Sequence, residues 1–147
     1  MKIEARDPVD PDLMGLIRAQ QDEIATMEGE THVAFPIFDD ISFLIGLVDG
    51  RGVACGALQP LEPGVGEIKR MYVIPEERGR GRARAILASL EARAREQGLH
   101  TLRLETGRFM PSALGLYTSS GYREIPLYGH YVGHAASICF EKAVDNR

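Results

Sequence analysis

Apolar residues recur along the chain either at alternate positions or at helical spacing, and the order of these segments predicts the fold. Lys2–Arg6 alternates apolar and polar residues, which predicts a short edge strand. Asp10 and Pro11 are typical of a helix N-cap and first helical position, and apolar residues at helical spacing continue to Met27–Gly29. The segment 30–40 has no period and is expected to be a loop that covers the core or lines a pocket.

The pattern in the middle of the chain predicts three consecutive strands. Two apolar, β-branched runs, Ser42–Val48 and Gly52–Gln59, flank the dipeptide Asp49-Gly50, which is typical of a tight hairpin turn. A turn rich in glycine and proline, Pro60–Gly66, then leads into a third strand, Glu67–Ile74. Short turns between consecutive strands predict antiparallel pairing.

The second half alternates helices and strands. The best-defined helix begins near Ala83, carries one apolar stripe, and ends at Gly98, a natural residue after a helix C-terminus. The later elements are expected to be a strand, a short helix after Pro111 and two closing strands, at Thr101–Glu105, Ser112–Ser119, Tyr122–Leu127 and Ser137–Ala143. This order predicts an α/β (α+β) fold: a mixed, central, twisted, mostly antiparallel sheet flanked by helices, in a single domain over residues 1–147.

Composition narrows the class of protein. The 147 residues are 44% hydrophobic and 26% charged, with a formal net charge of −4. These values are ordinary for a soluble globular protein, and the acidic balance argues against a nucleic-acid partner. The N-terminus lacks the apolar core of a signal peptide, and no apolar run approaches about 18 residues, so we expect a cytoplasmic protein with no membrane partner. Cys55 and Cys139 lie within apolar runs and are expected to be reduced core residues.

A glycine-spaced loop, Arg78-Gly79-Arg80-Gly81-Arg82-Ala83, joins the third strand to the best-defined helix. Glycines let a ligand approach the backbone, and the first amides of a helix lack intrahelical partners and carry partial positive charge. The loop therefore predicts a phosphate site. A simple helix-start turn with solvated arginines, or an Arg-Gly segment that binds RNA or protein, are the alternatives. Two known phosphate-binding motifs are excluded. The dinucleotide fingerprint needs a third glycine and the P-loop needs Gly-Lys-Ser/Thr, and both are absent from this loop.

The spacing Arg78-x-x-Gly81-x-Ala83 resembles the acetyl-CoA signature of the GNAT superfamily of N-acetyltransferases, Gln/Arg-x-x-Gly-x-Gly/Ala. The stretch LYTSSGY, residues 116–122, resembles a later motif of that family, and the expected order of elements is also the same. The resemblance implies that backbone amides along the loop hold the pyrophosphate of acetyl-CoA, and that the strand before it pairs with the pantetheine arm. The implied cofactor-binding residues are Met71, Tyr72, Val73, Arg78, Gly79, Arg80, Gly81, Arg82 and Ala83. It also implies a bulged strand that splays from its neighbour, and an extra residue near Lys69–Met71 would fit the apolar pattern.

The chemistry of acetyl transfer to an amine suggests catalytic residues. A lysine-like amine, with a pKa of about 10.4, must lose a proton, and the leaving thiolate must gain a proton or a hydrogen bond. Glu67 stands eleven positions before Arg78, where relatives place a catalytic glutamate, and is the expected base, with ordered water or an exposed strand-end residue as alternatives. Tyr117 is the expected acid, with a core tyrosine as the alternative. Relatives often carry Asn or Gln seven positions before this tyrosine, but Met110 stands there and cannot offer the same hydrogen bonds.

We therefore expect an acetyl-CoA-dependent N-acetyltransferase that acts on a primary amine of a small molecule, amino acid or peptide, by direct attack through a tetrahedral intermediate. A non-catalytic domain that senses acyl-CoA is the alternative. No metal is expected, because the loop Tyr128–His134 offers two histidines without supporting carboxylates or cysteines. That loop is expected to be a wall of the acceptor pocket or a contact in a homodimer, and Glu105 is a further candidate to attract the substrate amine.

Overall fold

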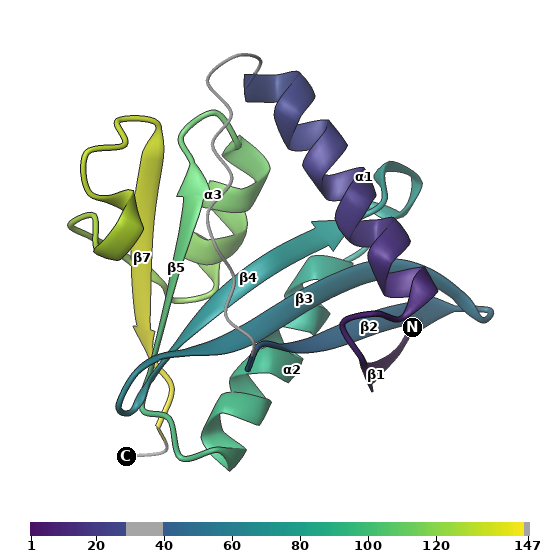
Figure 1. Ribbon diagram of the computed structural model, residues 1–147, viewed down its shortest axis with the longest axis horizontal. Coiled ribbons are helices and arrows are strands. Elements are labelled where there is room, and N and C mark those ends of the chain that lie inside the picture. Colours follow the sequence, from purple (N-terminus) through teal and green to yellow (C-terminus); the bar gives the residue numbers. More distant parts are fainter. Residues whose placement is uncertain (29–39, 146–147) are drawn as a thin grey trace.

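The computed structural model describes residues 1–28 and 40–145, and its described strands form one sheet of seven in the order β1-β2-β3-β4-β5-β7-β6 (Figure 1). Neighbouring strands are antiparallel except β4 and β5, which are parallel. The predicted mixed, mostly antiparallel sheet flanked by helices is confirmed. The strands are β1 (Lys2–Arg6), β2 (Ser42–Val48), β3 (Arg51–Glu62), β4 (Val65–Val73), β5 (Thr101–Gly107), β6 (Arg123–Ile125) and β7 (Ser137–Ala143). The helices are α1 (Pro11–Glu28), α2 (Arg82–Glu96) and α3 (Pro111–Ser119), with 3₁₀ turns at Pro75–Glu77 and Gly129–Tyr131.

Helix α1 covers one face of the sheet, and α2 and α3 cover the other (Figure 1). The carboxylate of Asp10 caps α1 as predicted, because the Leu13 amide donates to its Oδ2 at 3.0 Å. The centre of the apolar stripe of α2 is fully buried, with Ile86, Leu87 and Leu90 at most 1% exposed. Burying this stripe against the sheet makes α2 part of a single cluster of buried apolar residues that also includes Leu13 and Leu16 of α1.

The strands β4 and β5 pair only at their beginnings, where Val65–Glu67 lies beside Thr101–Arg103. Beyond these residues the two strands diverge, which confirms the predicted splay. A bulge contributes to it: between Cys55 and Ala57 of β3 the register shifts by one residue on β4, and Arg70 adopts a φ of 57°. The bulge lies within the segment expected from the sequence, Lys69–Met71.

Several predicted strand boundaries are wrong, and the largest differences are in β3 and β6. Strand β3 continues through Pro60 to Glu62, because pairing with β2 ends at Leu58 and the missing N–H of proline costs no ladder bond there. Strand β6 is only three residues long, since the Tyr122 amide donates to Tyr117 O at the end of α3 and Pro126 has no amide to donate. Of the loop predicted over 30–40, all but residue 40 lies outside the described residues.

Candidate functional site

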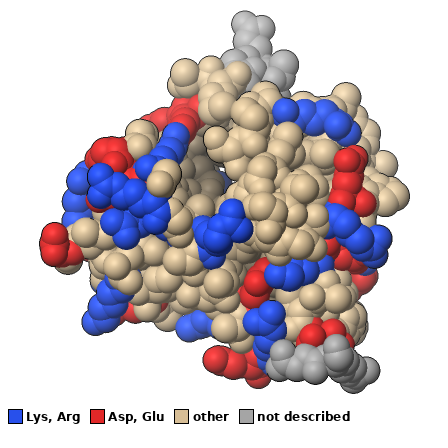
Figure 2. Space-filling model, turned by 180° about the vertical axis from the view of Figure 1, so that it is seen from behind, with Lys and Arg blue, Asp and Glu red and all other residues tan. Residues whose placement is uncertain are grey.

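A cavity of about 480 Å³ opens where β4 and β5 have diverged. Seen from behind, the molecule is hollowed on this side, and basic side chains gather beside the hollow (Figure 2). Four segments meet there: one face of α1, the end of β4, the loop that begins α2, and the start of α3. They contribute Gln20, Glu23, Ile24 and Met27; Met71, Tyr72 and Val73; Glu77, Arg78, Gly79, Gly81, Arg82, Ala83 and Arg84; and Met110, Pro111, Ser112, Ala113, Leu116 and Tyr117.

The N-terminus of α2 forms one end of this cavity. Gly81 is the N-cap residue at a φ of 76°, and no described side chain caps the first turn. A Cβ at Gly79 or Gly81 would meet no described atom within 4 Å, so open space lies beside these backbones. Arg82 is 17% exposed in its side chain, and its Nε is buried without a partner among the described residues. Uncapped amides, a buried donor and open space together suit an anionic ligand.

The side chain of Arg78 lines the cavity but is bound by the protein itself. Its Nε donates to Val73 O at 2.9 Å, and its two terminal nitrogens donate to the Glu23 carboxylate at 2.9 and 2.6 Å. The guanidinium also lies over the ring of Tyr72, 5.5 Å from its centroid. The Glu23 carboxylate raises the pKa of Arg78, and the Arg78 guanidinium lowers the pKa of Glu23. This side chain therefore fastens α1 to the end of β4.

The backbone of β4 presents polar groups to the gap. Tyr72 pairs with Cys55 of β3, and the Ile74 amide donates to Val53 O, so these two residues face β3. Since pairing directions alternate along a strand, Met71 and Val73 direct their N–H and C=O groups toward the gap. Both carbonyls already accept a side-chain donor, Met71 O from Gln20 Nε2 at 2.7 Å and Val73 O from Arg78 Nε.

Tyr117 lies on α3 and lines the cavity with only 5% of its surface exposed. Its ring packs edge-on against Tyr122, with 5.9 Å between the centroids. Burial, with a further contribution from the Glu105 carboxylate, raises the pKa of Tyr117 well above its ordinary value. The phenol therefore keeps its proton throughout the neutral range and can act as a donor. Met110 also lines the cavity, where its sulfur accepts a hydrogen bond from Thr106 Oγ1 at 3.8 Å.

Glu67 is buried, with 3% of its surface exposed, so the alternative of an exposed strand-end glutamate is wrong. Gln59 Nε2 donates to its Oε1 at 2.9 Å, while the hydroxyls of Tyr128 and Tyr131 donate to Oε2 at 2.5 and 3.2 Å. Lys69 Nζ lies 3.8 Å from Oε1 and donates to the Tyr131 hydroxyl at 2.8 Å. Glu67 is thus the centre of a buried polar cluster and is not among the described residues that line the cavity.

The loop before β7 supplies two of these donors. Burial, followed by the Glu67 carboxylate, raises the pKa of both Tyr128 and Tyr131 far above the ordinary value. Glu105 also contributes to the raised pKa of Tyr131, so its charge acts on this cluster and on Tyr117. The Ser137 hydroxyl donates to Glu105 Oε2 at 2.6 Å.

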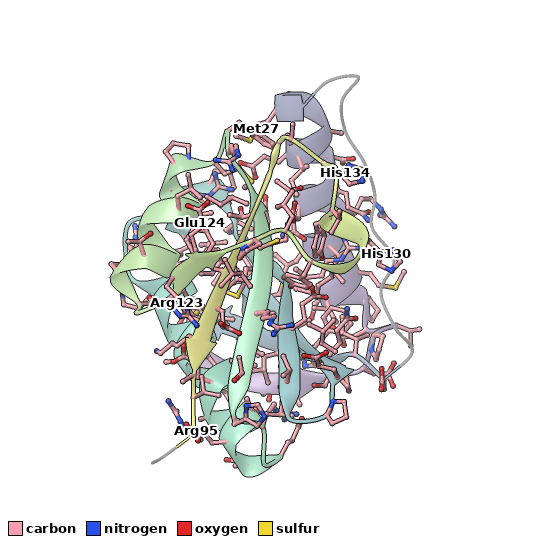
Figure 3. The ribbon with its side chains drawn as sticks, turned by 90° about the vertical axis from the view of Figure 1, so that its left-hand side faces the viewer. Met27, Arg95, Arg123, Glu124, His130 and His134 are labelled. Carbon is pink, nitrogen blue, oxygen red and sulfur yellow. The ribbon has the colours of Figure 1, made fainter. Side chains whose placement is uncertain are left out.

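The two histidines of this loop have a different setting. His130 and His134 extend from the α1 side of the sheet, whereas Arg123 and Glu124 lie on the α3 side (Figure 3). Within residues 1–28 and 40–145, no group of three or more His, Cys, Asp or Glu residues could hold a metal ion. In the same part of the chain, no helix is both long and apolar enough to cross a membrane.

The structure brings most of the predicted site residues to one cavity. Nine of them line it: Met71, Tyr72, Val73, Arg78, Gly79, Gly81, Arg82, Ala83 and Tyr117. Arg80 does not, because its side chain is 61% exposed and pairs with Glu77 at 3.3 Å. Sequence reasoning missed Gln20 and Glu23 of α1. A signal for Gln20 was available, since it interrupts the apolar stripe of α1 with a polar residue at helical spacing.

Comparison with known proteins agrees with this geometry. A sequence model described as the acetyltransferase (GNAT) family matches residues 12–122. The chain is 38% identical over 104 residues to an IAA acetyltransferase of Azospirillum brasilense, covering 70% of this chain and 68% of that protein. A structure from Klebsiella pneumoniae, assigned as an acyl-CoA N-acyltransferase, matches over 97% of each chain with a TM-score of 0.85 and 34% identity. PaiA N-acetyltransferase of Thermoplasma acidophilum, solved in complex with coenzyme A, matches 97% of this chain and 99% of that chain with a TM-score of 0.73 and 18% identity.

Proposed function

The chain belongs to the GNAT acetyltransferase family, and we propose that it transfers an acetyl group from acetyl-CoA to a primary amine. The acceptor class is a small molecule, an amino acid or a peptide, and the reaction is direct attack through a tetrahedral intermediate in a single domain over residues 1–147. One observation carries the proposal: the uncapped N-terminus of α2 opens into a cavity at the place where β4 and β5 separate.

The residues around the cavity suit coenzyme A. Its pyrophosphate would be held by the backbone amides of the loop from Arg78 to Ala83, which includes Gly79, Arg80, Gly81 and Arg82. Two observations support this assignment: Arg82 Nε has no partner in the described part of the chain, and open space lies at Gly79 and Gly81. A dianion here gains from both the helix dipole and the donors, each charge-assisted hydrogen bond contributing about 1.5–3 kcal/mol.

The gap-facing side of β4 would hold the pantetheine arm and the reacting carbonyl. Met71 and Val73 direct their N–H groups toward the gap, on either side of Tyr72. These donors can take amide carbonyls of the arm, and one can stabilise the oxyanion that forms when the amine attacks. Acetyl-CoA would supply an activated thioester. The strand β4 would orient this thioester and stabilise the charge that develops on its carbonyl oxygen.

Glu67 is proposed as the proton acceptor. The amine loses a proton as it attacks, and Oε2 of Glu67 is reached by the hydroxyls of Tyr128 and Tyr131. A hydroxyl that takes a proton from the amine while giving its own to the carboxylate would connect the acceptor to a buried base. This arrangement is supported by the short bond from Tyr128, at 2.5 Å.

Tyr117 is proposed as the donor to the leaving thiolate. It lines the cavity on α3, and burial keeps its phenol protonated.

Both cysteines, Cys55 and Cys139, are free and buried, which supports the proposed reducing, cytoplasmic setting. A homodimer is the proposed assembly, with the Tyr128–His134 loop as the segment to examine for contacts.

The test uses the full chain. We expect isothermal titration to show binding of acetyl-CoA, and a thiol-detection assay to show release of coenzyme A when a primary amine from a panel is added. Tertiary amines serve as the control, because their neutral nitrogen has no N–H to lose after attack and so cannot form a stable amide. A chain that binds no acetyl-CoA contradicts the proposal, and one that binds it without thiol release across the panel supports the acyl-CoA sensor instead.

A further inference from the structure

Gln20 is a polar residue on the buried face of α1. It is only 8% exposed and lines the cavity together with Glu23, Ile24 and Met27 of the same helix face. A buried amide normally finds partners for both its nitrogen and its oxygen, because an unmade hydrogen bond in the interior is unfavourable. Among the described residues, Gln20 has only one of the two.

The orientation of the Gln20 amide is fixed by its partner. Its Nε2 donates to Met71 O at 2.7 Å, and a backbone carbonyl can only accept, so the nitrogen must be on that side. The oxygen Oε1 is therefore on the other side, where it is buried with no partner among the described residues. The side chain thus offers one unused acceptor beside the cavity that it lines.

The gap-facing carbonyls of β4 each already accept one side-chain hydrogen bond, so a further acceptor would help to satisfy a ligand. A ligand arm with amide groups presents both C=O and N–H groups. The N–H groups of Met71 and Val73 can donate to the former, while the latter need acceptors. Of the carbonyls that would serve the latter, Met71 O already accepts from Gln20 and Val73 O from Arg78, so each keeps only its second lone pair. Gln20 Oε1 adds an acceptor on the cavity side that has no partner among the described residues.

We propose that Gln20 is a positioning residue for the acyl donor, whose Oε1 accepts a hydrogen bond from an amide N–H of the pantetheine arm. The inference rests on the proposed function, since it requires acetyl-CoA to lie along β4. The same amide ties the arm to Met71 O, so it sets the depth of the arm relative to the bulge at Arg70. It also gives α1 a direct part in donor recognition.

The experiment compares two ligands on three proteins. Coenzyme A contains the pantetheine arm, and adenosine 3′,5′-bisphosphate lacks it while keeping the nucleotide end. In Gln20→Leu we expect about a tenfold loss of affinity for coenzyme A, the effect of one hydrogen bond, and no change for the bisphosphate. Gln21→Leu is the matched control, because Gln21 is the next residue of α1 and is exposed. The control should bind both ligands as the wild type does.

Kinetics distinguish positioning from a general structural role. A contact with the arm is made in the ground state and the transition state alike, so Gln20→Leu should raise the KM for acetyl-CoA about tenfold with little change in kcat. Equal weakening of both ligands, or unchanged affinity for coenzyme A, would overturn the inference. If Gln20→Leu does not fold, Gln20→Met, which keeps an unbranched chain, takes its place in the same comparison. Failure of the wild type to bind coenzyme A would instead overturn the proposed function on which the inference rests.

Discussion

Helix α2 carries a glycine at each end in nearly the same conformation, which provides a controlled test of the phosphate site. Gly81 begins the helix and Gly98 follows it, and both have a φ of 76° with no described atom within 4 Å of an added Cβ. Alanine at either position must adopt a left-handed conformation, which costs roughly 1–2 kcal/mol. We therefore expect Gly81→Ala and Gly98→Ala to lower the Tm by similar amounts, about 2–8 °C for a chain of this size.

Only Gly81 faces the cavity, so only its substitution should weaken the binding of acetyl-CoA. The open space beside Gly81 is where we propose that the pyrophosphate lies, and a Cβ would push the phosphate away from the first amides of α2. Losing one charge-assisted hydrogen bond costs about 1.5–3 kcal/mol, which corresponds to a loss of affinity of roughly tenfold to more than a hundredfold.

Isothermal titration with acetyl-CoA on both variants, paired with thermal melts, checks this expectation. The informative quantity is the ratio of the two dissociation constants, because the strain common to both variants cancels in it. Equal affinities in Gly81→Ala and Gly98→Ala, with equal melting temperatures, would refute the assignment of the α2 N-terminus as the phosphate site.

Three further substitutions test the chemistry and the core. Glu67→Gln should lower kcat about a hundredfold and alter the pH–rate profile while leaving the KM for acetyl-CoA unchanged, as expected for the loss of a base. Tyr117→Phe should lower kcat about tenfold or more, by a factor that stays constant up to pH 10 because burial raises the pKa of this phenol. Its control is Tyr122→Phe, which removes a hydroxyl bonded to Glu91 away from the cavity and should affect stability but not rate. Burial raises the pKa of the Cys55 thiol to about 12, above the value of roughly 8.5 in an unfolded chain. The wild type should therefore lose roughly 3 kcal/mol more unfolding free energy than Cys55→Ala between pH 8 and pH 11, measured in urea.

Each of these expectations has a contrary result. An unaltered pH–rate profile in Glu67→Gln would assign the proton to water or to another residue. Equal rates for Tyr117→Phe and the wild type would reduce the tyrosine to a packing role. For Cys55 the sign follows from proton counts: between the two pKa values the unfolded chain has lost the thiol proton and the folded chain has kept it, so stability falls as pH rises. Parallel pH curves for wild type and Cys55→Ala would contradict a thiol held neutral by burial.

Features set by neighbouring residues were predictable from the sequence. Asp49-Gly50 forms the predicted hairpin turn, with φ values of 51° and 79°, because few other residues adopt such angles at low cost. The Asp10 cap, the left-handed Gly98 after α2 and the buried stripe of α2 followed in the same way. The family was also predictable, because its signature lies in a loop of six residues whose glycine positions are dictated by local backbone geometry.

Contacts between distant parts of the chain were decided only by the tertiary structure. The hydroxyl of Tyr128 reaches Glu67 across 61 positions, and Gln20 reaches Met71 across 51. The resemblance implied a role for the backbone amide of Arg78 at the phosphates, and only the structure shows that its side chain turns back to Glu23 on α1. These pairings depend on how α1 and the loop before β7 dock onto the sheet, and that docking is driven by non-directional burial of apolar surface.

The sequence by itself therefore determined the order of elements, the glycine loop and the family, because each is encoded in short-range spacing. The tertiary structure decided which polar groups are buried beside the gap between β4 and β5, and which donors and acceptors they have already used. The physical reason is that a hydrogen bond in the interior requires two groups to be brought within about 3 Å, which only the packed chain can do.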